Sequence, residues 1–421
     1  MVDDVVSLSW DPTSVTSDPK GTWDPNWSTP VFSLAERDRR YARVREFMAR
    51  DGLDAIVCLP DTGRFNRGNA DSMYLTQLGE NQELVTTVFP LEGDVVAWQS
   101  RPGMWPVSNW GIDIRRAEGR GMGAAMIIGR LKELGFDKGT VGVAGLTSTM
   151  YAYVRQAEGL ANWQSVESIK QAFPNAKVVS ATPALGEARY QKSPEEVEFL
   201  RNGVRVSELM IESVNDHGGP GAPERLLYAH MQFVAAASGG SFPVMVGWTS
   251  GPMGGGYHRL EQPSFRSQQP GDVLSLEIEG RWGGYVGRTD QSWTVGTASQ
   301  DYIDGMHLTF ESFNNVVAAM KPGATVAELI EAGHVEGMGG RGVSNLTMHG
   351  YGTGDEGPLV TGSRNPELLR TELKEGNTLL IKPGNQIDGK PGSGNWGDTV
   401  VVTSSGAERL GTRPQEVLEL D

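Results

Sequence analysis

The sequence contains almost no cysteine. Cys58 is the single one among 421 residues, so an internal disulfide is excluded, and so is a zinc site built from several thiolates. Cys58 lies in the apolar run of residues 55–59, whose length and composition are typical of a buried strand. We therefore expect this cysteine in the hydrophobic core.

Basic residues are outnumbered by acidic ones. The chain has 37 lysines and arginines against 52 aspartates and glutamates, which gives a formal net charge of -15. Binding nucleic acid over a broad surface requires a basic face, so the charge balance argues against a nucleic-acid partner. A small anionic substrate remains compatible with it, because a pocket can be locally cationic inside an acidic protein.

Long hydrophobic runs are absent as well. No apolar stretch approaches the roughly 20 residues that a membrane-spanning helix needs. The chain begins with an acidic segment, Met1 to Asp4, where a secretion signal would be basic and then apolar. We therefore predict a cytoplasmic protein that does not bind membranes.

The length is sufficient for about two to three domains of roughly 150 residues each. Strands and helices alternate along the first half, which predicts an α/β domain. We expect strands at 55–59, 84–89, 94–98, 140–143 and 177–180, and helices at 34–50, 123–134 and 151–156. A helix-starting pattern, Ser193-Pro194-Glu195-Glu196, marks a new domain. We predict an N-terminal domain over residues 1–190, with an arm at 1–32, and a second domain over 191–421.

The second half resembles the pita-bread fold family, which includes methionine aminopeptidases, prolidases and creatinase. The resemblance is carried by six segments in order: RYQKSPEEVEFLR (189–201), PGDVLSLEIEGRWGGYVGRTD (270–290), MKPGATVAEL (320–329), MHGYGTG (348–354), LKEGNTLLIKPG (373–384) and GDTVVVTSSGAERL (397–410). It implies an α+β domain of antiparallel sheets flanked by helices. The first half then resembles the smaller domain that precedes this unit in creatinase and prolidase.

The resemblance also identifies the positions at which the metal-dependent members bind two metal ions. Those members use two aspartates, one histidine and two glutamates. In this chain the five positions are occupied by Glu277, Arg288, His349, Lys382 and Gly397. A divalent ion beside an arginine and a lysine is repelled unless a dense shell of carboxylates offsets the two charges. We therefore predict no metal ion and no other cofactor.

Arg288 and Lys382 are candidates for a new role at these positions. An arginine fork and a lysine ammonium can hold a substrate carboxylate or a developing oxyanion. We expect Glu277 and Asp290 to line the same substrate site. The alternative is an inert salt-bridge network in which Glu277, Glu279 and Asp290 neutralise the two cations.

Histidine is the candidate for proton transfer. His258 resembles in position the general acid-base of creatinase, a member that works without metal, and a histidine titrates near neutral pH. We predict His258 and His349 as catalytic residues. The alternative for His258 is a structural histidine at a strand edge.

The residues of this chain differ from those expected of creatinase and of proline peptidases. Asp290 matches one of the two carboxylates with which creatinase holds a guanidinium group, but the other position is Lys382. The second histidine of the peptidase pattern falls near Glu356, which we expect to contact substrate instead. The sequence therefore argues against a creatinase and against an ordinary proline peptidase.

Three functions remain open. The first is metal-independent hydrolysis of a C–N bond in a small carboxylate-bearing substrate. The second is a lyase that cleaves C–O, C–S or C–C by elimination. The third is a binding module like the metal-less units of histone chaperones, although the long acidic tail expected there is missing. The resemblance further implies a homodimer, with Arg67 and Tyr74 as candidate contacts to the partner's pocket.

Overall fold

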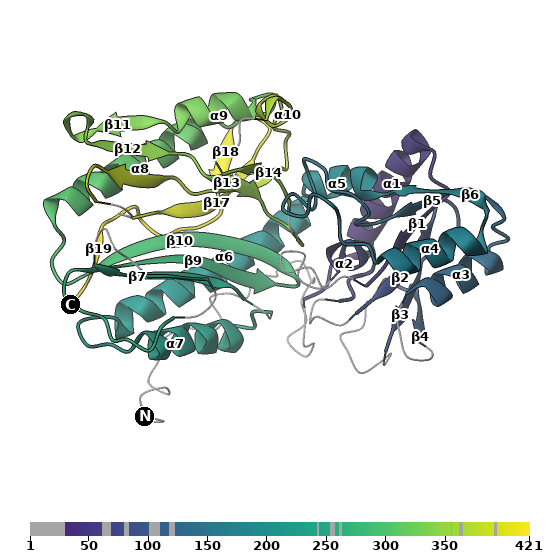
Figure 1. Cartoon of the computed structure of the whole chain (residues 1–421), viewed down its shortest axis with the longest axis horizontal. Coiled ribbons are helices and arrows are strands. Elements are labelled where there is room, and N and C mark those ends of the chain that lie inside the picture. The colour runs from purple at the N-terminus through teal and green to yellow at the C-terminus, as the bar shows by residue number, and fades with distance from the viewer. Residues whose placement is uncertain are drawn as a thin grey trace. The chain divides into compact units, whose positions relative to one another are not determined.

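The structure is a computed structural model of the chain (Figure 1). It describes residues 30–60, 69–79, 84–100, 110–117, 123–241, 244–252, 257–260, 263–354, 356–361, 365–390 and 394–421, with the backbone alone for 257–260. The described chain divides into two compact units. The C-terminal unit contains Glu196–Tyr351 and Pro358–Asp421, and the N-terminal unit contains the described residues up to Glu195 together with Gly352–Gly357.

The N-terminal unit is a mixed six-stranded sheet of order β4-β3-β2-β1-β5-β6, covered by helices. Its strands are β1 (Ala55–Cys58), β2 (Thr86–Pro90), β3 (Val96–Gln99), β4 (Asp113–Arg116), β5 (Lys138–Val143) and β6 (Asn175–Ser180). Its helices are α1 (Leu34–Asp51), α2 (Ala70–Thr76), α3 (Ala124–Glu133), α4 (Trp163–Ala172) and α5 (Thr182–Tyr190). The expected α/β domain is therefore present.

Strand β1 lies in the middle of this sheet and is buried on both faces. Because side chains alternate along a strand, Ile56 and Cys58 enter the core that contains α1 and α5, whereas Ala55 and Val57 enter the core that contains α3 and α4. This two-sided burial explains the uninterrupted apolar run. Cys58 is buried, as expected, and its burial raises the pKa of the thiol.

The helix expected at residues 151–156 is wrong. This segment is a set of turns, in which the backbone amides of Tyr151 and Ala152 donate to the Thr149 hydroxyl, and Tyr153 has a left-handed φ of 56°. A left-handed residue ends a helical path. Helix forms instead at α4, which begins with the Asn162 side chain accepting from the Ser165 amide.

The C-terminal unit is built around a long sheet whose path is β14-β13-β15-β17-β10-β9-β7-β8 (Figure 1). Its strands are β7 (Val246–Pro252), β8 (Tyr257–Leu260), β9 (Asp272–Trp282), β10 (Tyr285–Val295), β13 (Met348–Gly350), β14 (Glu356–Val360), β15 (Thr378–Ile381) and β17 (Gly397–Val402), with β18 (Ala407–Arg409) on β17 and β19 (Leu418–Leu420) on β10. A smaller sheet consists of β11 (Val335–Gly337), β12 (Gly342–Asn345) and β16 (Gly384–Ile387).

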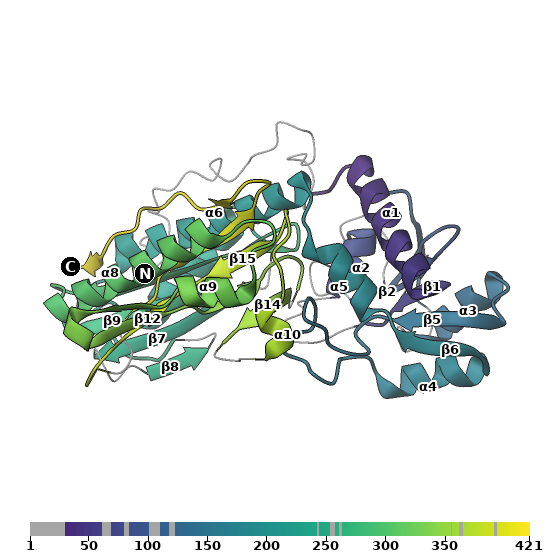
Figure 2. The same ribbon diagram turned by 90° about the horizontal axis from the view of Figure 1, so that it is seen from above.

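Helices flank the long sheet. They are α6 (Pro194–His217), α7 (Glu224–Ala237), α8 (Gln300–Ala319), α9 (Val326–Ala332) and α10 (Pro366–Leu369). Helices α6 and α7 run along β7, β9 and β10, and α8 and α9 lie beside β11 and β12 (Figures 1 and 2). This is the antiparallel, helix-flanked α+β unit that the sequence predicts. Among the helices that the structure describes, none is both long and apolar enough to cross a bilayer.

Helix α6 approaches the β9–β10 hairpin at backbone distance, because glycines meet there. A Cβ added to Gly287 would lie 2.1 Å from the Val204 nitrogen and 2.5 Å from the Leu200 oxygen. A Cβ on Gly280 would lie 2.0 Å from the Gly203 oxygen. These glycines let α6 support the hairpin directly, and the hairpin holds the charged residues of the next section.

We predict that Gly287→Ala lowers the free energy of unfolding by about 1–3 kcal/mol or more, because the methyl group collides with helix backbone that has no room to move. Denaturant unfolding measures this difference. Gly406→Ala is the matched control, since a Cβ at Gly406 meets no heavy atom within 4 Å. Equal stability of the two variants would contradict the close approach.

Candidate functional site

The β9–β10 hairpin carries four charged side chains on one face. Asp290 lies opposite Glu277, and Arg288 lies opposite Glu279. Residues two apart on a strand point to the same side, so the strand register alone brings these four together. The hairpin register thus creates a mixed cluster of one cation and three carboxyl groups.

Neighbouring strands complete the cluster. Lys382 directly follows β15, and His349 lies on β13, which pairs with β15 through His349 and Leu380. Gly397, on β17, is the partner of Asp290. A Cβ at Gly397 would lie 2.7 Å from the Lys382 Cβ. The glycine therefore lets β17 lie close to the chain at Ile381 and Lys382.

The carboxylate of Glu277 bridges the two cations. Its Oε2 lies 2.5 Å from Nη2 of Arg288, and its Oε1 accepts a 2.8 Å hydrogen bond from Nζ of Lys382. Arg288 also donates from Nε to Oδ1 of Asp290 at 2.9 Å, and Nζ of Lys382 lies 3.9 Å from Oδ2 of Asp290. We call Glu277, Arg288, Asp290 and Lys382 the cation site, after the two cationic side chains that it contains.

Arg288 has further partners on its remaining nitrogen. Its Nη1 donates to the hydroxyl of Tyr351 at 3.2 Å and lies 3.5 Å from Nε2 of His349. The Tyr351 hydroxyl in turn donates to Oε1 of Glu279 at 3.0 Å. The planar guanidinium group is thereby fixed on every side, as suits a fork of rigid donors.

Burial and charge oppose each other at this site. Burial acts to raise the pKa of Glu277, but the charges of Arg288 and Lys382 outweigh it and lower the pKa to about 2. Burial acts to lower the pKa of Arg288, and the charges of Asp290 and Glu277 raise it well above its ordinary value. Glu277 and Arg288 therefore stay ionised through the whole neutral range. Burial raises the pKa of Asp290, against the charges of Arg288 and Lys382.

The structure brings together Glu277, Arg288, Asp290, His349 and Lys382 of the predicted site residues. Two neighbours were not predicted. Tyr351 lies two residues beyond His349 in the same Gly-rich segment. Asn395 donates to Oδ2 of Asp290 at 3.3 Å. The signal for Tyr351 was present in the alternation of side chains beyond His349, whereas Asn395 becomes a neighbour through the fold alone.

None of the other predicted site residues has a described side chain in this cluster. His258 is on β8, where its backbone is opposite Thr249, and its side chain is outside the described part of the structure. Arg67 lies outside the described residues altogether. Tyr74 is fully buried in the N-terminal unit, with its hydroxyl donating to the Ala188 carbonyl at 3.3 Å.

Glu356 is part of a buried ion-pair network within the N-terminal unit. Its Oε1 lies 2.9 Å from Nη2 of Arg189, and its Oε2 lies 2.5 Å from Nζ of Lys192. Burial acts to raise the pKa of Glu356, but Lys192 and Arg189 outweigh it and lower the pKa. Nη1 of Arg189 also binds Oδ1 of Asp71 at 2.6 Å. Each carboxylate oxygen of Glu356 thus has a cationic partner already.

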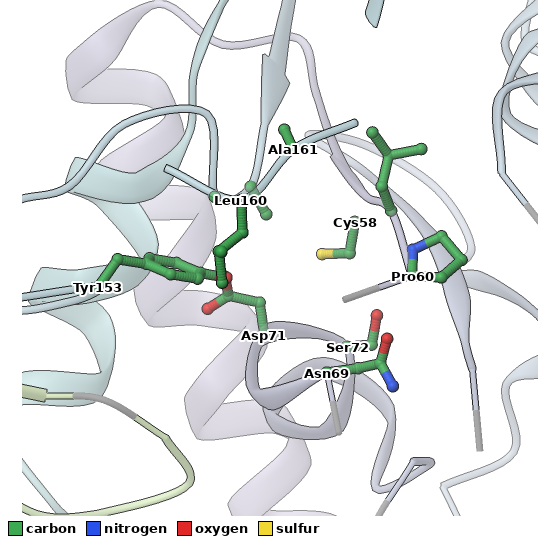
Figure 3. A pocket seen from close by; sticks show the side chains of 11 residues that line it. Cys58, Pro60, Asn69, Asp71, Ser72, Tyr153, Leu160 and Ala161 are labelled. Atoms are coloured by element: carbon green, nitrogen blue, oxygen red, sulfur yellow. The ribbon is translucent and has the colours of Figure 1, made fainter. Parts of the chain in front are cut away.

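A small cavity beside Asp71 is shown in Figure 3. It is lined by Cys58, Asn69, Asp71 and Tyr153 among others, and its free volume is about 10 Å³. That is roughly the space of one water molecule. The Tyr153 hydroxyl donates to Oδ2 of Asp71 at 2.6 Å. The cavity is therefore too small to hold a substrate.

Comparisons with known proteins give one family match and several relatives of known name. Residues 198–404 match the family described as "Metallopeptidase family M24". Creatinase from a Bacillus species is 23% identical over 417 residues, which cover 90% of this chain and 92% of the relative. Xaa-Pro dipeptidase from Pyrococcus furiosus is 23% identical over 265 residues, 62% of this chain and 74% of the relative.

Solved structures show the same fold. A dipeptidase from Pyrococcus horikoshii superposes with a TM-score of 0.68 at 20% identity, covering 90% of this chain and all (100%) of that one. A dipeptidase from Mycobacterium ulcerans superposes with a TM-score of 0.66 at 22% identity, covering 92% and 99%.

We predict a pH-dependent effect of Glu277→Gln. The folded pKa of Glu277, about 2, is below its ordinary value of 4.5, so ionised Glu277 stabilises the folded chain above about pH 4.5, and this contribution is lost as the pH falls toward 2. The wild type should therefore exceed the variant in free energy of unfolding at neutral pH, and the difference should shrink below about pH 4.5.

Urea unfolding across this acid range measures the difference. Glu336→Gln is the control, because the Glu336 side chain is 73% exposed. A difference between Glu277→Gln and wild type that stays constant with pH would show that Glu277 has no lowered pKa.

Proposed function

We propose, on the premise that this chain belongs to metallopeptidase family M24 and has its pita-bread fold, that the C-terminal unit is a metal-independent hydrolase. Its substrate is a small molecule with a carboxylate, and the bond cleaved is C–N. The observation that carries the proposal is the cation site, in which Arg288 and Lys382 hold one carboxylate between them, at 2.5 Å and 2.8 Å.

The donor set of this site does not fit a divalent metal ion. Arg288 and Lys382 supply only N–H donors, and they already bind the oxygens of Glu277 and Asp290. In the described parts of both units, no three His, Cys, Asp or Glu side chains form a group that could hold a metal ion. A metal placed here would meet two positive charges at contact distance, with few carboxylate oxygens left to bind it.

The two cations support carboxylate binding instead. A carboxylate accepts hydrogen bonds from a guanidinium fork and an ammonium group with charge assistance, which makes such bonds roughly twice as strong as neutral ones. Arg288 is held rigidly by Asp290 and Tyr351. A group oriented in advance loses little freedom when it binds a ligand.

Proton transfer is assigned to His258, with His349 beside Arg288 as a second polar group. In this scheme His258 accepts a proton from water while the water oxygen bonds to the substrate carbon. The same proton passes to the leaving nitrogen as the C–N bond breaks. No electrons are gained or lost, and water is the only co-reactant.

We also propose a homodimer with Arg67 and Tyr74 near the partner's site, and a division of the chain close to residue 190. The Tyr74 ring is buried within its own unit. It can contact a partner subunit only after the residues that cover it move away. Light scattering of the purified chain reports the number of subunits.

We expect purified protein to cleave small N-substituted amino acids and to leave the corresponding uncharged amides intact. When the reaction runs in water that contains a heavy oxygen isotope, the product should contain one heavy oxygen atom. Turnover should persist after dialysis against a chelator, because no step uses a metal ion. Mass spectrometry of products and elemental analysis of the protein give both readouts. Turnover that stops with the chelator and returns with a metal would overturn metal independence. Products without heavy oxygen would indicate a lyase.

We expect His258→Ala to reduce kcat by about 100-fold or more, the usual contribution of a general acid-base, with little change in KM. His334→Ala is the matched control, since the His334 side chain is half exposed and the residue directly precedes β11 of the small sheet. The pH profile of kcat should also lose its limb near neutral pH. Unchanged kcat would remove His258 from the mechanism.

A further inference from the structure

Glu277 is the most exposed member of the cation site. Its side chain is 32% exposed, against 13% for Lys382, 3% for Arg288 and 0% for Asp290. It is also the one that both cations share. The shared carboxylate is therefore the group that a ligand arriving from solvent meets first.

Arg288 and Lys382 each have partners other than Glu277 that hold them in position. Without it, Arg288 keeps its bonds to Asp290 and Tyr351, and its backbone amide donates to the Thr399 hydroxyl at 3.0 Å. Lys382 keeps Asp290 at 3.9 Å. The two cations are thus anchored independently of the carboxylate that bridges them.

The chain also leaves space beside Glu277. Gly247 on β7 is its partner across the sheet, and a Cβ there would lie 3.0 Å from the Glu277 Cβ and 3.3 Å from its Oε2. Any larger residue at this position would press against the glutamate side chain. The glycine gives that side chain freedom to change its direction.

We propose that Glu277 is an internal stand-in for the substrate carboxylate, which displaces the Glu277 carboxylate from Arg288 and Lys382 on binding while Glu277 turns toward solvent. This inference rests on the proposed function and specifies how its site admits a ligand. Exchange of one carboxylate for another keeps both cations paired throughout. That avoids the large penalty of leaving a buried charge without a partner.

The exchange makes the site selective. A neutral ligand cannot replace the bond that Glu277 makes to each cation, so it gains nothing by entering. A carboxylate replaces those bonds but must compete with Glu277 for them. The competition weakens the affinity for every carboxylate. Only ligands that make additional contacts with the protein therefore bind tightly.

Binding of acetate tests this exchange, with acetamide as the uncharged probe of the same shape. Calorimetry at low ionic strength compares wild type, Glu277→Gln and the control Glu336→Gln. We expect Glu277→Gln to bind acetate about tenfold more tightly than wild type, because the two charge-assisted bonds of Glu277 no longer compete. Acetamide binding should stay weak in all three proteins, and Glu336→Gln should match wild type.

Three further variants separate a change in the site from a folding defect. Adding Lys382→Met to Glu277→Gln should abolish the gain in acetate affinity, whereas adding Lys390→Met, at a lysine that pairs with Asp301, should leave it intact. Glu277→Asp is shorter by one methylene and cannot span both cations, so it should bind acetate with intermediate affinity. Thermal melts confirm that each variant is folded.

Equal acetate affinity in wild type and Glu277→Gln would overturn the proposal, and so would a gain that survives Lys382→Met. Neither result depends on turnover. A gain in acetate affinity without any hydrolysis would support the exchange while contradicting the hydrolase. Hydrolysis with no such gain would support the hydrolase and contradict the exchange.

Discussion

The shared carboxylate between Arg288 and Lys382 is the interaction on which the C-terminal site depends. Two cations this close repel each other, and burial increases the repulsion. Glu277 binds one cation with each oxygen, and Asp290 lies against both. Replacing either carboxylate by an apolar side chain would leave a buried charge uncompensated, which is among the most destabilising changes in a protein.

Small residues make room for this arrangement. Gly397 lets β17 lie close to the chain at Ile381 and Lys382, and Gly247 leaves space beside Glu277. Gly280 and Gly287 let α6 lie directly against the hairpin that carries Arg288 and Asp290. A side chain at 397 would collide with the Ile381 carbonyl oxygen and with the Cα and Cβ atoms of Lys382. We propose that these residues form a metal-free site in a pita-bread fold.

Much of the fold follows from sequence patterns, since uninterrupted and alternating apolar runs specify strands such as β1 and the β9–β10 hairpin. The two-residue turn of this hairpin also fixes its register, which places Glu277 opposite Asp290. Long-range packing decides the rest. The turns around Tyr153 replace an expected helix, and Asn395 becomes a neighbour of Asp290 only through the fold. Glu356 illustrates the same limit, because its cationic partners, Arg189 and Lys192, are distant in sequence.

The central proposal is that Arg288 and Lys382 form a cationic pair that takes the place of metal ions in the C-terminal unit. Anomalous diffraction from crystals grown with excess Mn²⁺ tests it most directly. The account predicts no anomalous peak among Glu277, His349 and Asp290, with Arg288 and Lys382 still sharing the Glu277 carboxylate. A peak at bonding distance from Glu277 and His349, with Arg288 turned away, would contradict it.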